Sequence, residues 1–300
     1  MKISNISTEK RNNNTLSIDQ ATSLEIVSMM NEEDTNVPNA IKDILPAIAE
    51  AIDGTVDRMK KGGRLIYIGA GTSGRLGILD AVECPPTFST SNEVQAVIAG
   101  GNHAMFKAFE GAEDDEEQGA KDLIAQQVNA QDIVVGIAAS GRTPYTIGGM
   151  KEAKKNGAFV IAVVCSHHSE MAKIADIPLE ANVGPEVIAG STRLKAGTAQ
   201  KLILNMLSTG TMIKLGKVYS NLMVDLKPSN YKLKVRSINI IIEATGASEE
   251  EARKALETYG TVKGAIVSML TNLEGEQVFK ALEKHHGHIQ NIIKEVNNIK

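Results

Sequence analysis

Short segments rich in Ile and Val recur through the middle of this chain, and the stretches between them have helical character. Helical stretches separate most of these segments, and an alternation at about 25 to 35 residues is typical of a strand followed by a helix. The alternation predicts βαβ units and one parallel sheet. Buried helices are the alternative, but the segments are short and β-branched, which favours strands. The predicted strands cover residues 64–68, 94–99, 132–138, 158–165 and 174–179.

The sequence before the first strand indicates an arm and two helices. Residues 1–15 are polar and predict a mobile arm, which leads into a helix over 18–31. The segment 34–38 interrupts the helical pattern. A second helix is expected to end near residue 61, and Pro46 should delay or kink its start.

The sequence after the last predicted strand is helical throughout. A long helix is expected over 192–215, with a buried apolar stripe. Further on, Ser248 and Glu251 have the spacing of a capping box, which marks the start of another helix. We therefore predict three segments: an arm and helix over 1–37, an α/β domain over 38–231 and an all-α bundle over 232–300.

Composition narrows the classes of partner. The formal net charge is −4, so no global basic field is present to hold nucleic acid or an anionic membrane surface. Aromatic residues make up only 3% and Trp is absent, which disfavours a stacking platform for bases. The two cysteines have no CxxC spacing, no apolar run is long enough to span a bilayer, and residues 1–20 lack a signal-like apolar core. These features predict a cytoplasmic protein with no nucleic-acid or membrane partner.

A glycine-rich loop follows the first predicted strand. Gly69, Gly71 and Gly74 fit the pattern G-x-G-x-x-G, so a dinucleotide site is one interpretation and a merely tight turn is another. A dinucleotide site needs an acidic residue after the second strand, but the acidic residue at that spacing, Glu93, precedes its strand. The third interpretation is a phosphate cradle at a helix N-terminus, with hydroxyl groups from Thr72 and Ser73.

A second loop of similar chemistry follows the third predicted strand. It contains Ser140, Arg142 and Thr143 around a glycine. Two such loops at the carboxyl ends of parallel strands can converge on one anion. The pair therefore favours the phosphate cradle over the other two interpretations. A further loop before the long helix contains Glu186 and Lys195 and could form a polar wall for a sugar, or a plain capped loop.

Two glutamates have a context that suggests chemistry. Glu83 precedes Pro85 and Pro86, which we expect to end the helix and hold the carboxylate at a rigid corner. Glu113 lies in an acidic run. For both glutamates a plain surface carboxylate is the simpler interpretation of the residues by themselves. The histidines at 285, 286 and 288 have no matching carboxylate set, so no metal site is predicted.

Four stretches of the chain resemble the N-acetylmuramic acid 6-phosphate etherase family, and the similarity extends over nearly the whole chain. They are YIGAGTSGRLGILD at 67–80, ECPPT at 83–87, GIAASGRTPY at 136–145 and KAGTAQK at 195–201. The resemblance implies the sugar isomerase (SIS) fold, a flavodoxin-like three-layer sandwich with a five-stranded parallel sheet and a small helical bundle. It also implies cleavage of a lactyl ether from a phosphosugar, with water, to N-acetylglucosamine 6-phosphate and D-lactate. No metal or other cofactor is implied.

The resemblance also implies roles for single residues. Glu83 matches the acid that protonates the departing lactate, and Glu113 matches the second glutamate, the expected base at carbon 2. Glu186 and Lys195 would be sugar contacts. A phosphosugar aldose–ketose isomerase and a non-catalytic phosphosugar-binding regulator remain the alternatives, although the regulator would be expected to lack a glutamate.

The spacing of two predicted site residues raises the question of subunit sharing. Ser73 and Glu83 are ten residues apart, roughly 15 Å along one helix. That is too far for one straight helix to reach both the phosphate and carbon 3 of the same sugar. Either the chain turns back at the two prolines, or Glu83 serves the neighbouring subunit. We predict the second, a homodimer with shared active sites.

Overall fold

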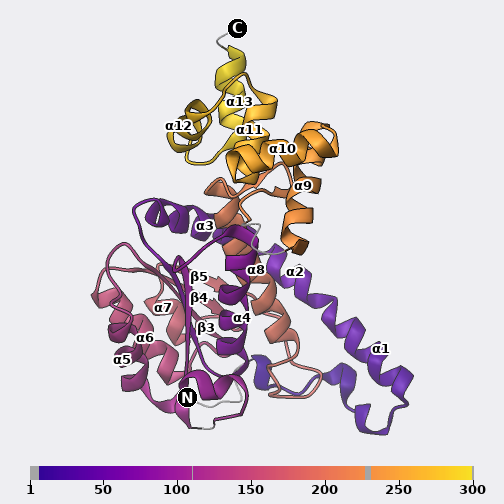
Figure 1. Cartoon of the computed structure of the whole chain (residues 1–300). Helices are drawn as coiled ribbons and strands as arrows, with labels where there is room; N and C mark the ends of the chain where they lie inside the picture. Colours follow the sequence, from indigo (N-terminus) through magenta and orange to yellow (C-terminus); the bar gives the residue numbers. More distant parts are fainter. Residues whose placement is uncertain (1–6, 110, 227–230, 299–300) are drawn as a thin grey trace. The chain divides into compact units, whose positions relative to one another are not determined.

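The computed structural model describes residues 7–109, 111–226 and 231–298 (Figure 1). The chain divides into two compact units. The first unit comprises residues 1–82 and 92–208, and the second comprises 83–91 and 209–300.

A five-stranded parallel sheet forms the centre of the first unit, which confirms the predicted fold class. Its strand order is β2-β1-β3-β4-β5, a flavodoxin-like order. The first four strands lie within a residue or two of their predicted bounds, but Ile174 belongs to helix α7 rather than to the fifth strand. The strands are β1 (Leu65–Gly69), β2 (Val94–Ile98), β3 (Ile133–Ala138), β4 (Phe159–Val164) and β5 (Ile177–Glu180).

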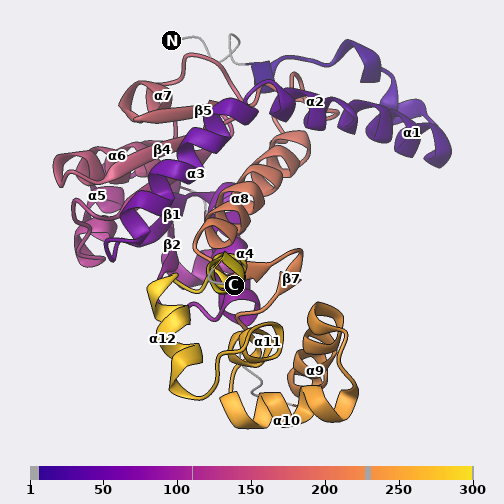
Figure 2. The ribbon, with the colours of Figure 1, turned by 90° about the horizontal axis from the view of Figure 1, so that it is seen from above.

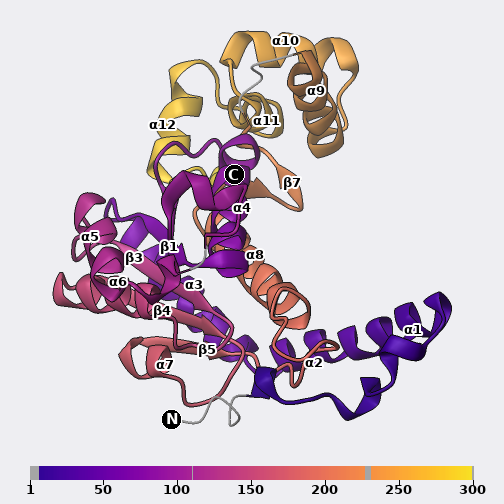
Figure 3. The same ribbon diagram turned by 90° about the horizontal axis from the view of Figure 1, so that it is seen from below.

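Helices cover both faces of this sheet. One face packs against α5 (Glu116–Ala125), α6 (Pro144–Lys155) and α7 (Glu170–Ile174) in an aliphatic core. The other face is covered by α3 (Leu45–Met59), α4 (Gly71–Phe88) and α8 (Lys195–Lys214). Figures 2 and 3 show these two groups of helices on opposite sides of the strands.

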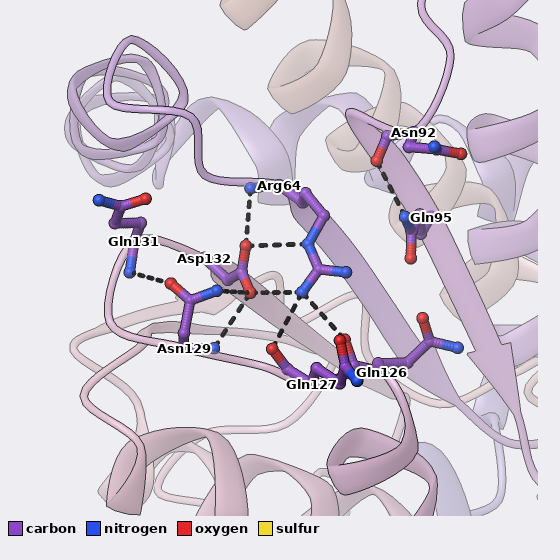
Figure 4. A network of polar contacts seen from close by, with 8 residues as sticks. All are labelled: Arg64, Asn92, Gln95, Gln126, Gln127, Asn129, Gln131 and Asp132. Carbon is purple, nitrogen blue, oxygen red and sulfur yellow. Dashed lines mark hydrogen bonds and ion pairs between the residues drawn. The ribbon is translucent and has the colours of Figure 1, made fainter.

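A buried ion pair fixes how β1 and β3 are aligned at their amino ends (Figure 4). Arg64 donates from its backbone N–H to Asp132 Oδ1 at 2.9 Å and from Nη2 to Asp132 Oδ2 at 2.7 Å. Asn129 also donates to Asp132, from its backbone N–H at 3.1 Å. Burial alone would raise the pKa of Asp132, but the hydrogen bonds from Arg64 and Asn129 outweigh it and hold this pKa below its usual value. The network sets the register in which Leu65 pairs with Ile133.

The segment before α3 is more ordered than the sequence suggested. Helix α1 (Ser23–Asp34) begins at a capping box of Thr22 and Glu25, and α2 (Asn36–Lys42) follows at once. The expected interruption at 34–38 is confirmed at Thr35, which separates the two helices, but it is shorter than predicted. Pro38 already belongs to the first turn of α2, where no helical N–H is needed. Pro46 lies in the first turn of α3 and starts that helix late, as predicted. Three short 3₁₀ turns precede α1: η2 (Ser7–Glu9), η3 (Asn13–Thr15) and η4 (Ile18–Gln20).

Residues 7–15 are also anchored, so the expected mobile arm is not supported for this part. Thr15 Oγ1 donates to the carbonyl of Val187 at 2.9 Å, and Asn12 Nδ2 donates to that of Pro185 at 3.2 Å. Residues 1–6, which share that prediction, lie outside the described part of the chain.

Helix α4 continues past the two prolines, so the predicted stop at Pro85 and Pro86 is wrong. The helix ends at Phe88. Thr87 Oγ1 donates to the carbonyl of Glu83 at 2.9 Å, and the N–H of Ser89 donates to the carbonyl of Pro85 at 3.0 Å. The ring of proline fixes φ near the helical value, so Pro85 and Pro86 fit the helix although each lacks an N–H donor. The two bonds from Thr87 and Ser89 continue the helical turn.

The second unit contains a helical bundle with its own aliphatic core, as the sequence predicted. The capping box of Ser248 and Glu251 opens α10, as predicted. Its helices are α9 (Tyr231–Thr245), α10 (Glu249–Tyr259), α11 (Val262–Leu270), α12 (Glu276–Lys284) and α13 (Ile289–Asn298), preceded by a hairpin of β6 (Val218–Tyr219) and β7 (Leu222–Met223). Within the described residues, no helix combines the length and apolar character needed to cross a bilayer.

Glycines allow α5 and α6 to touch backbone to backbone, and this contact generates a prediction. A Cβ atom at Gly148 would lie 1.9 Å from the carbonyl oxygen of Glu116. We expect Gly148→Ala to lower the free energy of unfolding by about 2 kcal/mol or more, in the upper range of overpacking costs. Gly197→Ala on α8 is the matched control, since the nearest atom, Thr72 Cγ2, would be 3.5 Å away. Urea denaturation measures both, and equal stability of the two variants would contradict the close approach.

Candidate active site

The two predicted phosphate loops meet at one edge of the sheet. Strands β1 and β3 are neighbours, while β2 lies beyond β1 and β4 lies beyond β3. The strand order therefore reverses between β1 and β3, which is where ligands bind in open α/β sheets. Because Gly69 pairs with Ile137, the loops that follow these strands leave the sheet side by side.

The first loop turns directly into α4. Gly71 has a positive φ of 53°, and the helix begins there. Ser73 is only 8% exposed, and its hydroxyl donates to Oε1 of Gln200 on α8 at 2.9 Å. The Nε2 of Gln200 is buried and has no hydrogen-bond partner among the described residues. Thr72 lies beside Gly197 of α8. This end of α4 therefore presents free backbone N–H groups next to an unsatisfied amide donor.

The second loop is held by a tight turn at Gly141. The carbonyl of Ser140 accepts from Ser166 Oγ at 2.7 Å, and Ser140 Oγ accepts from the N–H of Arg142 at 3.3 Å. Arg142 Nη1 is 3.7 Å from Glu170, while its buried Nε has no partner among the described residues. Thr143 occupies the N-cap position of α6, but its hydroxyl makes no capping bond. Hydroxyl and guanidinium donors thus remain available at the start of α6.

A pocket of about 140 Å³ opens on the other side of β1, toward β2. Glu113, in the 3₁₀ turn η6 (Ala112–Asp114), lines it together with Gly71 and Arg75 of α4. The structure thus brings Glu113 to the same end of α4 as the first loop. The remaining lining residues are apolar: Ala70, Ala99, Ala104, Ala108 and Phe109.

Glu186 and Lys195 belong to a buried charge cluster. The Glu186 carboxylate accepts from the backbone N–H groups of Lys195 and Ala196, both at 2.9 Å, and so caps α8. Burial raises the pKa of Glu186, although these N–H groups and the charge of Lys195 oppose the rise. The Lys195 ammonium, on a residue 1% exposed, pairs with Glu33 of α1. The hydrogen bonds described for this pair join Glu186 to the start of α8 and Lys195 to Glu33. The role of Glu186 and Lys195 as sugar contacts stays a prediction.

Glu83 lies on α4 in the part of that helix assigned to the second unit. Its side chain is exposed. It is one helical turn after Asp80, which is buried in the first unit.

Sequence reasoning missed two residues of this region, Gln200 and Arg75. Gln200 sits in the predicted apolar stripe of α8, between Ala196, Ala199 and Ile203, all fully buried. A polar residue inside an apolar stripe is a detectable signal of a buried polar contact. Arg75 gave no such signal, because its partners are carbonyl groups about 30 residues away in sequence.

The parallel sheet and the two loops at its switch point have the architecture of the SIS class of proteins. Family models agree: residues 47–154 match the glucokinase regulatory protein N-terminal SIS domain, and residues 106–209 match the SIS domain. A candidate phosphosugar isomerase involved in capsule formation from Bacteroides fragilis has a similar fold, with a TM-score of 0.50, 17% identity and coverage of 67% of this chain and 95% of that one.

Relatives over the full length identify the family within this class. An N-acetylmuramic acid 6-phosphate etherase of Clostridium beijerinckii is 52% identical, over 99% of both chains. One from an Enterobacter species is 49% identical, over 97% of this chain and 98% of the relative. The chain belongs to the N-acetylmuramic acid 6-phosphate etherase family.

The buried pair of Lys195 and Glu33 generates a prediction about stability. Lys195→Met would leave a buried carboxylate without its cation, which costs about 3–5 kcal/mol of unfolding free energy at pH 7. Lys151→Met, which breaks the exposed pair with Glu116, is the control and should cost at most about 1 kcal/mol.

The pH dependence of this loss has a defined sign. Burial acts to raise the pKa of Glu33, but hydrogen bonds from Lys195 and neighbouring asparagines outweigh it, so the pKa lies below its usual 4.5. The pair therefore stabilises the wild type above pH 4.5, and this contribution is lost as the pH falls through the lowered pKa. Without Lys195 the pKa of Glu33 should rise. In acid, protonation of Glu33 then removes the unpaired buried charge that destabilises the variant. Denaturation should show a smaller difference in unfolding free energy between the wild type and Lys195→Met at pH 4 than at pH 7. An unchanged difference would contradict this account.

Proposed function

We propose that this protein cleaves the lactyl ether of N-acetylmuramic acid 6-phosphate with water, giving N-acetylglucosamine 6-phosphate and D-lactate. The single observation that carries the proposal is the 52% identity to a named etherase over 99% of the chain. The geometry supports it, because an acidic side chain and a helix N-terminus meet at one edge of the sheet.

In the proposed reaction the sugar is in its open-chain form, where the aldehyde makes the carbon 2 proton acidic. Glu113 takes that proton, the bond from carbon 3 to the lactyl oxygen breaks, and Glu83 protonates the departing oxygen. Glu83 then takes a proton from water, which adds to carbon 3 of the unsaturated aldehyde while carbon 2 regains a proton. The two carboxyl groups thus alternate as acid and base.

The phosphate would bind at the reversal point of the sheet. The positive end of α4 and its free N–H groups attract an anion. We propose that Thr72 and Ser73 supply hydroxyl groups from one loop, and that Ser140, Arg142 and Thr143 supply donors from the other. The unpaired donors at Arg142 Nε and Gln200 Nε2 support this, because buried polar groups without partners are otherwise costly.

Two separate measurements test the roles of the glutamates. Glu113→Gln should abolish both D-lactate release and exchange of the carbon 2 hydrogen with heavy water, because no base remains. Glu83→Gln should slow D-lactate release by roughly 10²–10⁴-fold and still permit exchange. Exchange at the wild-type rate in Glu113→Gln would place the base elsewhere. Isomerised sugar phosphate without D-lactate from the wild type would overturn the etherase in favour of an isomerase.

We also propose a cytoplasmic homodimer whose active sites are shared between subunits. The chain does not turn back at Pro85 and Pro86, because α4 continues to Phe88. This supports the arrangement in which Glu83 of one subunit acts on the phosphosugar held by Ser73 and Ser140 of the other.

Mixed dimers test the sharing of sites. Glu83→Ala and Ser140→Ala chains, carrying different tags and co-expressed, should form heterodimers with one intact and one doubly defective site. Such heterodimers should recover about half of the wild-type activity, while each parent homodimer stays nearly inactive. Purified heterodimers no more active than the parents would mean that both residues serve the same chain's site.

A further inference from the structure

Arg75, at the edge of the sheet, is held by hydrogen bonds to carbonyl groups and has no ion-pair partner within the described residues. Its Nε and Nη2 donate to the carbonyl of Ala104 at 3.0 and 2.8 Å, and its Nη2 also donates to that of Lys107 at 3.3 Å. These acceptors are neutral. No carboxylate of the described residues forms an ion pair with Arg75, and none of these residues accepts a hydrogen bond from its Nη1. The guanidinium is therefore fixed in orientation, and the described residues supply neither a counter-ion for its charge nor an acceptor for its Nη1.

The fixed guanidinium lines the pocket of about 140 Å³ on the β2 side of β1. The other walls are mostly alanine side chains, with Glu113 among them. A wall of methyl groups fits a small branched apolar fragment, and the guanidinium together with the positive end of α4 fits an anion. The pocket thus has the chemistry to take a short acid that carries a methyl group.

Helix geometry separates this pocket from the proposed phosphate site. Ser73 and Arg75 are two residues apart, which turns their side chains by roughly 200° around α4. Ser73 contacts α8, while Arg75 contacts the chain that follows β2. The two residues consequently serve opposite sides of β1, and an anion held by Arg75 is not the one held by the two phosphate loops.

We propose that Arg75 binds the carboxylate of the substrate's lactyl group and thereby selects this leaving group. The assignment rests on the proposed function, in which Glu113 acts at carbon 2 and the lactyl ether is attached to the adjacent carbon 3. That attachment brings the lactyl group next to Glu113, and therefore to this pocket. The lactyl methyl group packs against the alanine walls, and the carboxylate accepts from Nη1. The guanidinium also offsets the repulsion between this carboxylate and Glu113.

A comparison of two substrates tests the assignment. They are N-acetylmuramic acid 6-phosphate and its analogue with the lactyl carboxylate converted to a carboxamide. The wild type should prefer the acid by about 10- to 100-fold in kcat/KM, the value of a charge-assisted hydrogen bond. Arg75→Met should lose that factor on the acid and show no preference between the two substrates. Arg75→Lys keeps the positive charge but lacks the planar guanidinium group. It should retain an intermediate preference for the acid over the carboxamide.

The two substrates also separate recognition from a structural role. If Arg75 only holds the loop at 104–107, Arg75→Met lowers kcat/KM equally for both substrates and the preference survives, which overturns the assignment. Arg253→Met, which removes an exposed arginine of α10, is the matched control and should preserve the preference. Should Arg75→Met fail to fold, a wild-type preference below threefold overturns the proposal, and a larger preference that narrows in Arg75→Lys supports it. Absence of D-lactate from the wild type with the natural acid would instead refute the proposed function.

Discussion

The placement of helix α4 depends on one buried carboxylate, Asp80. Its Oδ2 accepts from the hydroxyl of Tyr67 on β1 at 2.7 Å, and its Oδ1 accepts from Asn205 Nδ2 and Ser208 Oγ on α8 at 2.9 and 3.1 Å. Burial raises the pKa of Asp80, and these three hydrogen bonds together with the charge of Lys201 counter the rise. A strand and two helices thus share one acceptor group. A rotation of α4 would leave this buried group unsatisfied, so α4 has one permitted orientation.

That single orientation determines what the start of α4 presents to a ligand. Gly77 lets the helix lie close to β1. A Cβ atom at this position would be only 2.9 Å from the Cβ of Tyr67. Ser73 then contacts α8, and Arg75 faces the chain after β2. One helix terminus therefore divides the sheet edge into a region between β1 and β3 and a pocket on the β2 side. A substrate with anions at two separated positions matches this division better than a substrate with one phosphate alone.

The sheet was predictable from the sequence because its strands are short and its three central strands are almost entirely buried, with residues that fit a pleated surface. Because β1 and β3 are buried on both faces, each is a continuous apolar run in the sequence. Such a run can be recognised without knowing which strand pairs with it. Some of the errors concern proline. Pro38 sits in a first helical turn, and Pro85 and Pro86 sit inside a last one, where their φ is helical and the surrounding bonds continue. A rule that treats every proline as a helix stop fails in a first turn, where the N–H groups have no intrahelical acceptor. It also fails in the last turn of α4, where the bonds from Thr87 and Ser89 continue the helix past the prolines.

The candidate site was predictable only where its chemistry is local. A glycine loop followed by hydroxyl residues predicts an anion site from a few residues, and both such loops follow neighbouring strands. Lys195 could not be understood this way, because its partner Glu33 is 162 residues away in sequence and only folding reveals that the ammonium is buried. Arg75 stands in the same string of letters as Ser73, yet the helix turns the two side chains to opposite sides of β1. A sequence motif shows which residue types lie close together in the chain. The direction of each side chain follows instead from the orientation of α4, which the hydrogen bonds of Asp80 fix. Residues within one motif can therefore serve two different groups of one ligand.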